Sequence, residues 1–357
     1  MKVGIVGLPN AGKSTLFNAL TKAGAQTGDY PFTTIEPNVA IAQVPDERLE
    51  RVAETVRSSK LVPAAISFHD IAGLVKGAAE GEGLGNRFLA SIRETDAICH
   101  VLRCHSDPGV PHPDGRVDPI ADIETIETEL VLADYEQVER RLERVGKQAK
   151  SGDAAALAER DWLEAVREAL GAGRPARSVP VPEAAPRAPR LLQALTFKPI
   201  LYVANVEEGE GEAPAAVRAH AAEAGAGVVA VSARIEAELA ELDPAEAEEM
   251  RRSFGGEGSG LARLVRASYD LLELITFFTA GEDNEAVARP LPRGATAWDA
   301  AGTIHTEIQE AFIKAEVVGW ERLVECGGYV GARDRGLLRI EGRDYLIQDG
   351  DVVTIKV

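Results

Sequence analysis

The sequence predicts an α/β fold built on a parallel sheet, and two observations support this prediction. Apolar runs at 3–6, 64–68 and 97–102 have the length of buried strands, and helix-compatible stretches at 13–22 and 87–95 separate them. A glycine-rich turn joins the first strand-like run to the first helix. The chain has 357 residues, more than the roughly 250–300 at which single cores stop growing, so we expect more than one domain.

Composition and charge exclude several classes of protein. A content of 45% apolar and 27% charged residues is typical of globular proteins, and no apolar run approaches the roughly 18 residues of a membrane span. The net charge of −18 repels phosphate backbones, so we expect local contacts with nucleic acid and no sequence-specific DNA binding. Three cysteines form neither a disulfide pattern nor a zinc pattern. Because a strand begins at Lys2, we expect no signal peptide and a cytoplasmic location.

The strand pattern resumes at 199–204 and 227–231 after a long helical interruption. Apolar residues of this interruption recur at alternating spacings of four and three, which predicts a helix that packs against a partner. Asp153 follows a predicted turn and is placed to cap that second helix. We therefore predict an antiparallel helical hairpin at 122–196, inserted into an α/β domain of residues 1–121 and 197–275. The predicted seam is Val131, Tyr135, Val138, Leu142, Val145 and Ala149, facing Leu157, Leu163, Val166 and Leu170.

From residue 276 the pattern changes to short strand-like segments around one helical stretch. An Asp349-Gly350 turn precedes an alternating apolar segment, which is a turn-and-strand signal. We expect a separate β-rich domain over 276–357. Its predicted strands are 276–279, 312–318, 337–340, 344–347 and 352–357, and its predicted helix is 296–309.

Residues 7–14, GLPNAGKS, match the P-loop pattern in the context that the pattern requires, between a strand and a helix. The glycines let backbone amides point at the β- and γ-phosphates of a nucleotide, Lys13 neutralises phosphate charge, and the Ser14 hydroxyl ligates Mg²⁺. The predicted contacts in this segment are Asn10, Ala11, Gly12, Lys13, Ser14 and Thr15.

Two further segments complete the predicted phosphate and metal site. Asp70 ends a buried strand and begins a DxxG arrangement, which sets its carboxylate behind Mg²⁺ and the Gly73 amide on the γ-phosphate. In the loop YPFTTIEP at 30–37, the Thr34 hydroxyl could bind Mg²⁺ when a γ-phosphate is present. The predicted Mg²⁺ ligands are therefore Ser14, Thr34 and Asp70.

The segment that should recognise the base differs from that of a GTPase. GTPases of this design read guanine with Asn-Lys-x-Asp, whereas residues 205–208 read NVEE, with Val206 for the lysine and Glu208 for the aspartate. The longer Glu208 side chain cannot take the place of the aspartate, so the feature that rejects adenine is missing and ATP is the expected substrate. The predicted base-side contacts are Asn205, Val206, Glu208, Ser232 and Ala233.

Together these segments resemble the YchF/OLA1 (Obg-like) ATPase family over essentially the whole chain. The matching segments are GLPNAGKS at 7–14, YPFTTIEPN at 30–38, DIAGLVKGA at 70–78, GEGLGN at 81–86 and NVEE at 205–208. The resemblance implies an Obg-type P-loop nucleotide domain, a coiled-coil-like insertion and a C-terminal TGS domain with a β-grasp fold. It also implies Mg²⁺-dependent hydrolysis of ATP in preference to GTP, and association with ribosomes in translation or stress control.

The group that orients the attacking water should not be the usual glutamine. Leu74 stands where Ras-like enzymes place it, and an apolar side chain cannot orient water. His112 matches a histidine that family members carry in the loop 104–118, and a neutral imidazole could accept from the water. The alternative is a solvent-exposed loop histidine, and His105 is the weaker candidate for the role. Asn10 resembles an asparagine that places a monovalent cation, here K⁺, in related NTPases.

Two other functions fit the sequence: an Obg-like GTPase, or a ribosome-binding module with incidental turnover, which Leu74 and the TGS domain would favour. Thr33 stands where many relatives carry cysteine, so we expect no redox control through that position. Two basic clusters could contact a ribosome, and we favour the first, although both could be solvated faces paired with acidic neighbours. They are Arg140, Arg141, Arg144, Lys147 and Lys150 on the hairpin, and Arg333, Arg335, Arg339 and Arg343 near the C-terminus.

Overall fold

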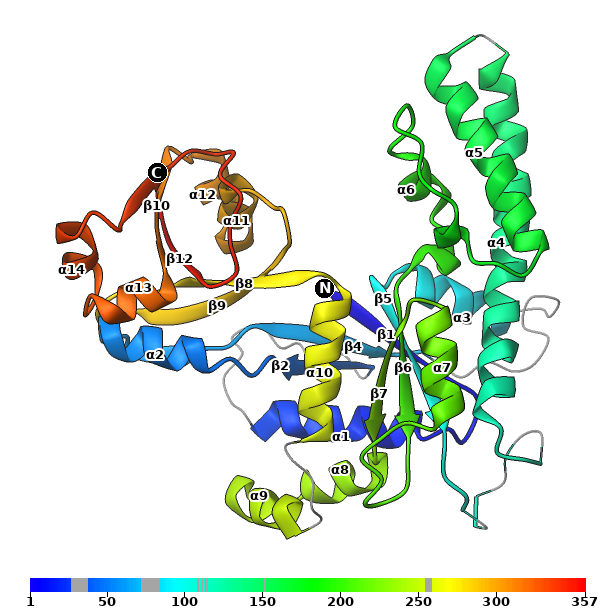
Figure 1. The fold of residues 1–357 in the computed structure, drawn as a ribbon, viewed down its shortest axis with the longest axis horizontal. Coiled ribbons are helices and arrows are strands. Elements are labelled where there is room, and N and C mark those ends of the chain that lie inside the picture. Colours follow the sequence, from blue (N-terminus) through cyan, green and yellow to red (C-terminus); the bar gives the residue numbers. More distant parts are fainter. Residues whose placement is uncertain are drawn as a thin grey trace. The chain divides into compact units, whose positions relative to one another are not determined.

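The computed structural model describes residues 1–26, 38–71, 84–107, 109–110, 112, 115–150, 152–253 and 259–357. The chain forms two units, Met1–Ala40 with Ser67–Ser268, and Ile41–Ile66 with Tyr269–Val357 (Figure 1). The sequence had placed residues 41–66 in the nucleotide domain, and this boundary was wrong. These residues join the second unit because β3 (Lys60–Val62) pairs in parallel with β9 (Glu285–Pro292).

The predicted parallel sheet has the strand order β2-β4-β1-β5-β6-β7, and β1, β5, β6 and β7 lie wholly in the first unit. Strands β5 and β6 are buried along their whole length, which explains why they appear in the sequence as continuous apolar runs. Parallel pairing joins β4, β1, β5, β6 and β7, so the carboxyl ends of these strands lie at one edge. The strands are β1 Lys2–Val6, β2 Val39–Gln43, β4 Ala65–Asp70, β5 Ala97–Arg103, β6 Ile200–Asn205 and β7 Gly227–Val231.

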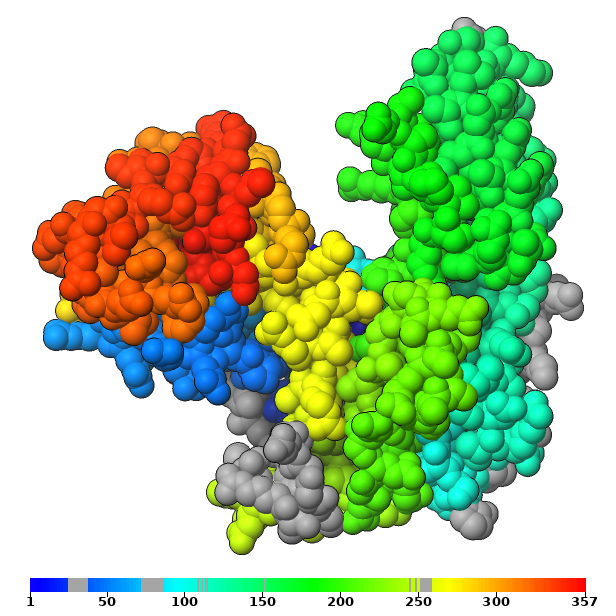
Figure 2. All heavy atoms as spheres, viewed as in Figure 1, coloured from blue at the N-terminus to red at the C-terminus, as the bar shows by residue number. Residues whose placement is uncertain are grey.

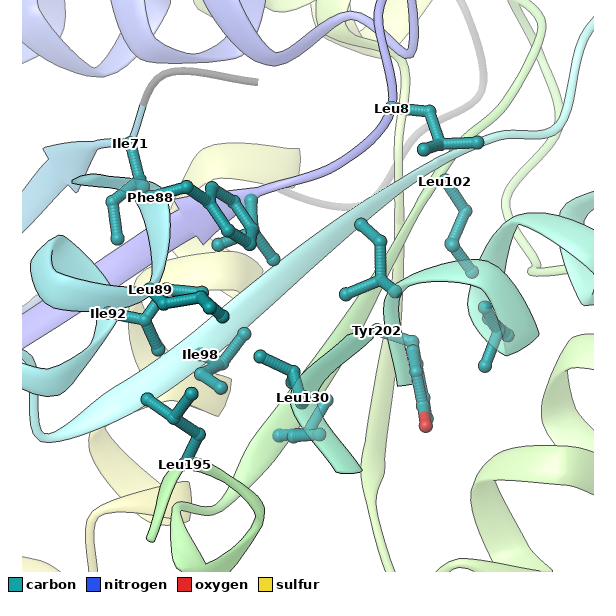
Figure 3. Close-up of a cluster of buried hydrophobic side chains, with 14 of the residues drawn as sticks. Leu8, Ile71, Phe88, Leu89, Ile92, Ile98, Leu102, Leu130, Leu195 and Tyr202 are labelled. Carbon is teal, nitrogen blue, oxygen red and sulfur yellow. The ribbon is translucent and has the colours of Figure 1, made fainter. Parts of the chain in front are cut away.

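Helices cover the sheet and build its apolar core. On one face, Phe88, Leu89 and Ile92 of α3 form a buried cluster with Ile98 of β5 and Leu130 of the long helix α4 (Pro119–Ala149) (Figure 3). Complete burial of each such side chain contributes about 1.5–3 kcal/mol, so this layer stabilises the packing of α3 and α4 on the sheet. The shorter helices of the unit are α1 Lys13–Gln26, α3 Leu84–Arg93, α7 Ala215–Glu223, α8 Ala233–Leu239, α9 Pro244–Ser253 and α10 Gly260–Leu271.

The predicted hairpin consists of α4 (Pro119–Ala149) and α5 (Ala154–Gly171), which extend beyond the sheet (Figures 1 and 2). Helix α4 begins earlier than predicted because the Asp118 carboxylate accepts from the amide of Ala121 and caps it. Asp153 caps α5, as predicted. None of the helices in the described part of the chain has the length and apolar character that crossing a membrane requires.

The hairpin seam is largely the predicted one. Val138 and Val145 of α4 are fully buried against Leu163 and Val166 of α5. Tyr135 is 38% exposed, but its ring lies close to Gly171 at the end of α5, so it borders the seam without being buried in it. The connection back to the sheet holds short turns of helix, namely η1 Ala176–Ser178, α6 Ala188–Leu192 and η2 Leu195–Phe197.

The second unit is a sheet of order β11-β10-β12-β8-β9-β3 with short helices. The predicted helix 296–309 is two helices, because His305 is extended and its side chain caps the second one. Residues 344–347 form no strand and contribute an isolated bridge between Leu346 and Thr296. The other elements are α2 Glu47–Val56, β8 Leu274–Thr279, β10 Lys314–Gly319, β11 Arg339–Glu341, β12 Asp351–Lys356, α11 Ala297–Ile304, α12 Thr306–Glu310, α13 Trp320–Glu325 and α14 Tyr329–Asp334.

Candidate functional site

A cavity of about 570 Å³ lies at the carboxyl ends of the parallel strands. Ligands of open parallel sheets bind at this edge, where the loops after neighbouring strands converge. One wall is the P-loop, with Asn10, Gly12, Lys13, Ser14 and Thr15. The other lining residues, called the second wall below, are His105, Ser106, Asp107, Val110, Asn205, Val206, Glu207, Ser232, Ala233 and Arg234.

The P-loop wall has the backbone geometry of an anion-binding turn. Helix α1 begins at Lys13, so its unpaired amides and positive end face the cavity. Gly12 has a φ of 98°, and a Cβ at this position would collide with the side chain of Asn205. Both the conformation and the space therefore require glycine at position 12. The K⁺ role expected of Asn10 stays a prediction.

The side chain of Asn205 joins three loops around the cavity. Its Nδ2 donates to the carbonyl oxygen of Ala11 at 3.1 Å, and its Oδ1 accepts from the amide of Ala233 at 3.0 Å. Its Nδ2 also lies 3.3 Å from Nε2 of His105, which acts as the acceptor when the proton of a neutral imidazole is on Nδ1. Asn205 is 5% exposed, so these bonds form away from bulk water.

The residues present fit a Mg²⁺ ion. Oδ1 of Asp70 is buried and has no hydrogen-bond partner among the described residues, as expected of a carboxylate that awaits a cation. Burial lowers the pKa of Lys13, while the nearby Asp70 carboxylate opposes that shift. No cluster of three or more His, Cys, Asp or Glu ligands occurs in the described ranges. Thr34 and Gly73 lie outside the described residues.

Among the described residues, the structure brings the predicted nucleotide contacts to the cavity with two exceptions. Ala11 is buried behind the wall, where its carbonyl accepts from Asn205. Glu208 does not line the cavity, and its carboxylate lies 3.3 Å from the guanidinium of Arg234. The sequence missed Glu207, Arg234, Ser106, Asp107 and Val110, whereas His105, the weaker candidate for orienting the water, does line the cavity. The pairing of β5 with β6 would have indicated these residues, because the loops that follow two neighbouring parallel strands lie at the same edge of the sheet.

His112 lies elsewhere. Its side chain is 4% exposed and its Nε2 lies 3.3 Å from Oδ2 of Asp122 on α4, whereas the cavity lining does not include it. The expectation of a solvent-exposed loop histidine was therefore wrong. The structure does not bring His112 together with the P-loop residues, and its role in catalysis stays a prediction.

A P-loop at the head of α1, with Asp70 at the end of β4, defines a P-loop nucleotide-binding protein. A family model described as "50S ribosome-binding GTPase" matches residues 2–146, and the model of the YchF GTPase C-terminal domain, described as a protein of unknown function, matches residues 274–357. The chain belongs to the YchF family, which confirms the resemblance seen in the sequence.

Three relatives show the extent of this similarity. The protein named "Ribosome-binding ATPase YchF" of Bacillus subtilis is 50% identical over 359 residues, covering 99% of this chain and 98% of its own. The protein of that name from Haemophilus influenzae is 49% identical, with 99% and 98% covered. The solved structure of the YchF GTPase of Schizosaccharomyces pombe is 33% identical, with a TM-score of 0.88 and 100% and 97% covered.

Replacing Asn205 with alanine should weaken nucleotide binding by at least about tenfold, because the Ala233 amide and the Ala11 carbonyl then lose their buried partner. Isothermal titration with ATP and Mg²⁺ measures the change. Asn284→Ala is the matched control, since the amide of Asn284 donates only locally, to the carbonyl of Glu282. Equal affinities for the Asn205 variant and the unchanged chain would contradict the role of Asn205.

Proposed function

We propose that this chain is a Mg²⁺-dependent ATPase that hydrolyses ATP in preference to GTP. We further propose that it acts in the cytoplasm as a nucleotide-controlled regulator that associates with ribosomes in translation or stress control. The names of the bacterial relatives support the ATPase activity and the ribosome as partner. The fission yeast relative is named a GTPase, so the choice of base needs an argument from this chain.

The position of Glu208 carries the proposal of ATP preference. In a GTPase the fourth residue of the base motif accepts hydrogen bonds from guanine, and here that residue is turned to Arg234 and lies outside the cavity lining. Val206 lines the cavity where the motif would have lysine, and it offers no hydrogen bond. A guanine base would therefore lack the contacts that normally select it over adenine.

The proposed hydrolysis relies mainly on electrostatic positioning. The amides at the start of α1 and the ammonium of Lys13 would bind the phosphates, and Ser14 and Asp70 would hold Mg²⁺, whose charge stabilises them further. His112 would accept a hydrogen bond from the attacking water. Oδ2 of Asp122 lies 3.3 Å from Nε2 of His112, so with the proton of the neutral imidazole on Nε2, Nδ1 would be the nitrogen that accepts.

Titration of ATP and GTP in one Mg²⁺ buffer should show tighter binding of ATP. The double variant Val206→Lys with Glu208→Asp recreates the guanine motif, and it should raise GTP affinity by about tenfold. A guanine nucleotide that binds the unchanged chain tenfold more tightly than its adenine counterpart would refute the proposed preference.

Substitution of His112 by alanine should leave ATP affinity nearly intact and lower the single-turnover rate by about 10², because it removes the proposed base. Lys13→Ala should instead weaken ATP binding, since it removes a phosphate contact. His220→Ala changes a histidine on α7 that does not line the cavity and serves as the control. An unchanged single-turnover rate in His112→Ala would remove His112 from the mechanism.

Each of the two candidate surfaces for a ribosome contains basic residues that pair with acidic neighbours. Arg141 pairs with Glu159 at 2.7 Å and is mostly buried, so its charge stabilises the hairpin. Arg339 lies near Glu341 and Asp351 and stacks on Tyr345, as the solvated-face alternative expected. The exposed hairpin residues Arg144, Lys147 and Lys150 form no ion pair with any residue that the structure describes, and the same holds for the exposed Arg333 and Arg335 of the C-terminal cluster.

Reversing Arg144 and Lys147 to glutamate should weaken binding to ribosomal particles and flatten its salt dependence, because fewer counterions are released. ATP hydrolysis by the free protein should not change. Arg333→Glu with Arg335→Glu is the matched control for the C-terminal cluster. Sedimentation at several salt concentrations measures binding, and a loss confined to the control variant would reject the hairpin surface.

A further inference from the structure

Arg103, the last residue of β5, carries a buried cation whose partners are backbone carbonyls. The side chain is 2% exposed. Its Nη1 donates to the carbonyl of Val110 at 2.9 Å, its Nη2 to that of Asp107 at 3.1 Å, and its Nε to that of His105 at 3.3 Å. Burying a guanidinium is costly unless its donors are satisfied, so the loop and the arginine constrain each other.

The three carbonyls belong to residues that line the nucleotide cavity. We call residues 104–107, 109 and 110 the pocket loop. His105, Asp107 and Val110 of this loop form part of the second wall. The Asp107 carboxylate accepts from the amide of Gly109 at 2.8 Å, which tightens the turn between the bonds to Arg103.

Arg103 and Asn205 occupy partner positions on neighbouring strands. They face each other in the register of β5 and β6, and the amide of Cys104 donates to the carbonyl of Asn205 at 2.9 Å. His105 of the pocket loop lies 3.3 Å from the Asn205 side chain. Arg103 and Asn205 thus lie side by side at the ends of β5 and β6. Arg103 bonds to the pocket loop, and Asn205 bonds to the P-loop.

We propose that Arg103 is a positioning residue that fixes the second wall for the nucleoside part of the ligand, while the P-loop binds the phosphates without it. This inference rests on the proposed ATPase function. A planar guanidinium reaches three carbonyls in different directions, whereas a lysine ammonium has a single nitrogen and methionine has no donor. Loss of the guanidinium therefore frees the pocket loop and leaves the P-loop bonds of Asn205 in place.

The test compares two ligands on the full-length chain. ATP contacts both walls, whereas inorganic tripolyphosphate offers only phosphates. With Mg²⁺ present, Arg103→Met should lower the affinity for ATP by about tenfold and change the affinity for tripolyphosphate by less than about twofold. The ATP affinity of Arg103→Lys should lie between those of Arg103→Met and the unchanged chain. Arg177→Met is the matched control, because Arg177 also donates to a backbone carbonyl, that of Thr196, and does not line the cavity.

Unchanged ATP affinity in both variants would overturn the inference, and so would an equal loss for ATP and tripolyphosphate, which indicates collapse of the whole pocket. Thermal unfolding identifies a variant that does not fold, and if Arg103→Met fails, the ligand comparison on Arg103→Lys decides. If the unchanged chain binds neither ATP nor tripolyphosphate, the proposed function itself is wrong. If only the inference is wrong, the unchanged chain still binds ATP normally.

Discussion

The amide group of Asn205 bonds to three loops at once, and the shape of the nucleotide pocket depends on it. An amide is both donor and acceptor, so one side chain satisfies the Ala11 carbonyl and the Ala233 amide. A carboxylate or an aliphatic group of the same size would satisfy at most one of them. The bonds hold because β6 is buried along its length and cannot shift. The glycine at position 12 is a further consequence, since the amide occupies the space of a Cβ.

The features predicted correctly from sequence are those whose physical cause is local. The P-loop pattern, the buried strands and the capped hairpin each follow from neighbours in the chain, and the structure contains them. The exposure of Tyr135 depends on tertiary packing and was missed, and so was the local cap that His305 places on the second helix. Strand β9 was not predicted and contains Pro290 and Pro292. Since β3 pairs with Glu285, Ala286 and Val287, both prolines lie where β9 is an edge, a position that prolines tolerate.

The candidate site divides in the same way. Residues of the P-loop were predictable because one segment supplies them, whereas the second wall needs the order of the strands. Glu207 and Glu208 are neighbours with opposite surroundings, and sequence alone cannot tell which of them faces the cavity. His112 was identified by family resemblance, which says nothing of its contact with Asp122.

The second unit is assembled from two separate stretches of chain, and this limits how it can be cut or transplanted. Residues 41–66 supply β3 and α2, and Arg48 of α2 forms an ion pair with Asp349 at 2.7 Å. A fragment that begins at residue 276 would expose the edge of β9 that β3 covers and would lose the partner of Asp349. The segment from residue 276 onward is therefore not an independent folding unit. Gene truncations or fusions at residue 276 should yield a polypeptide prone to aggregate.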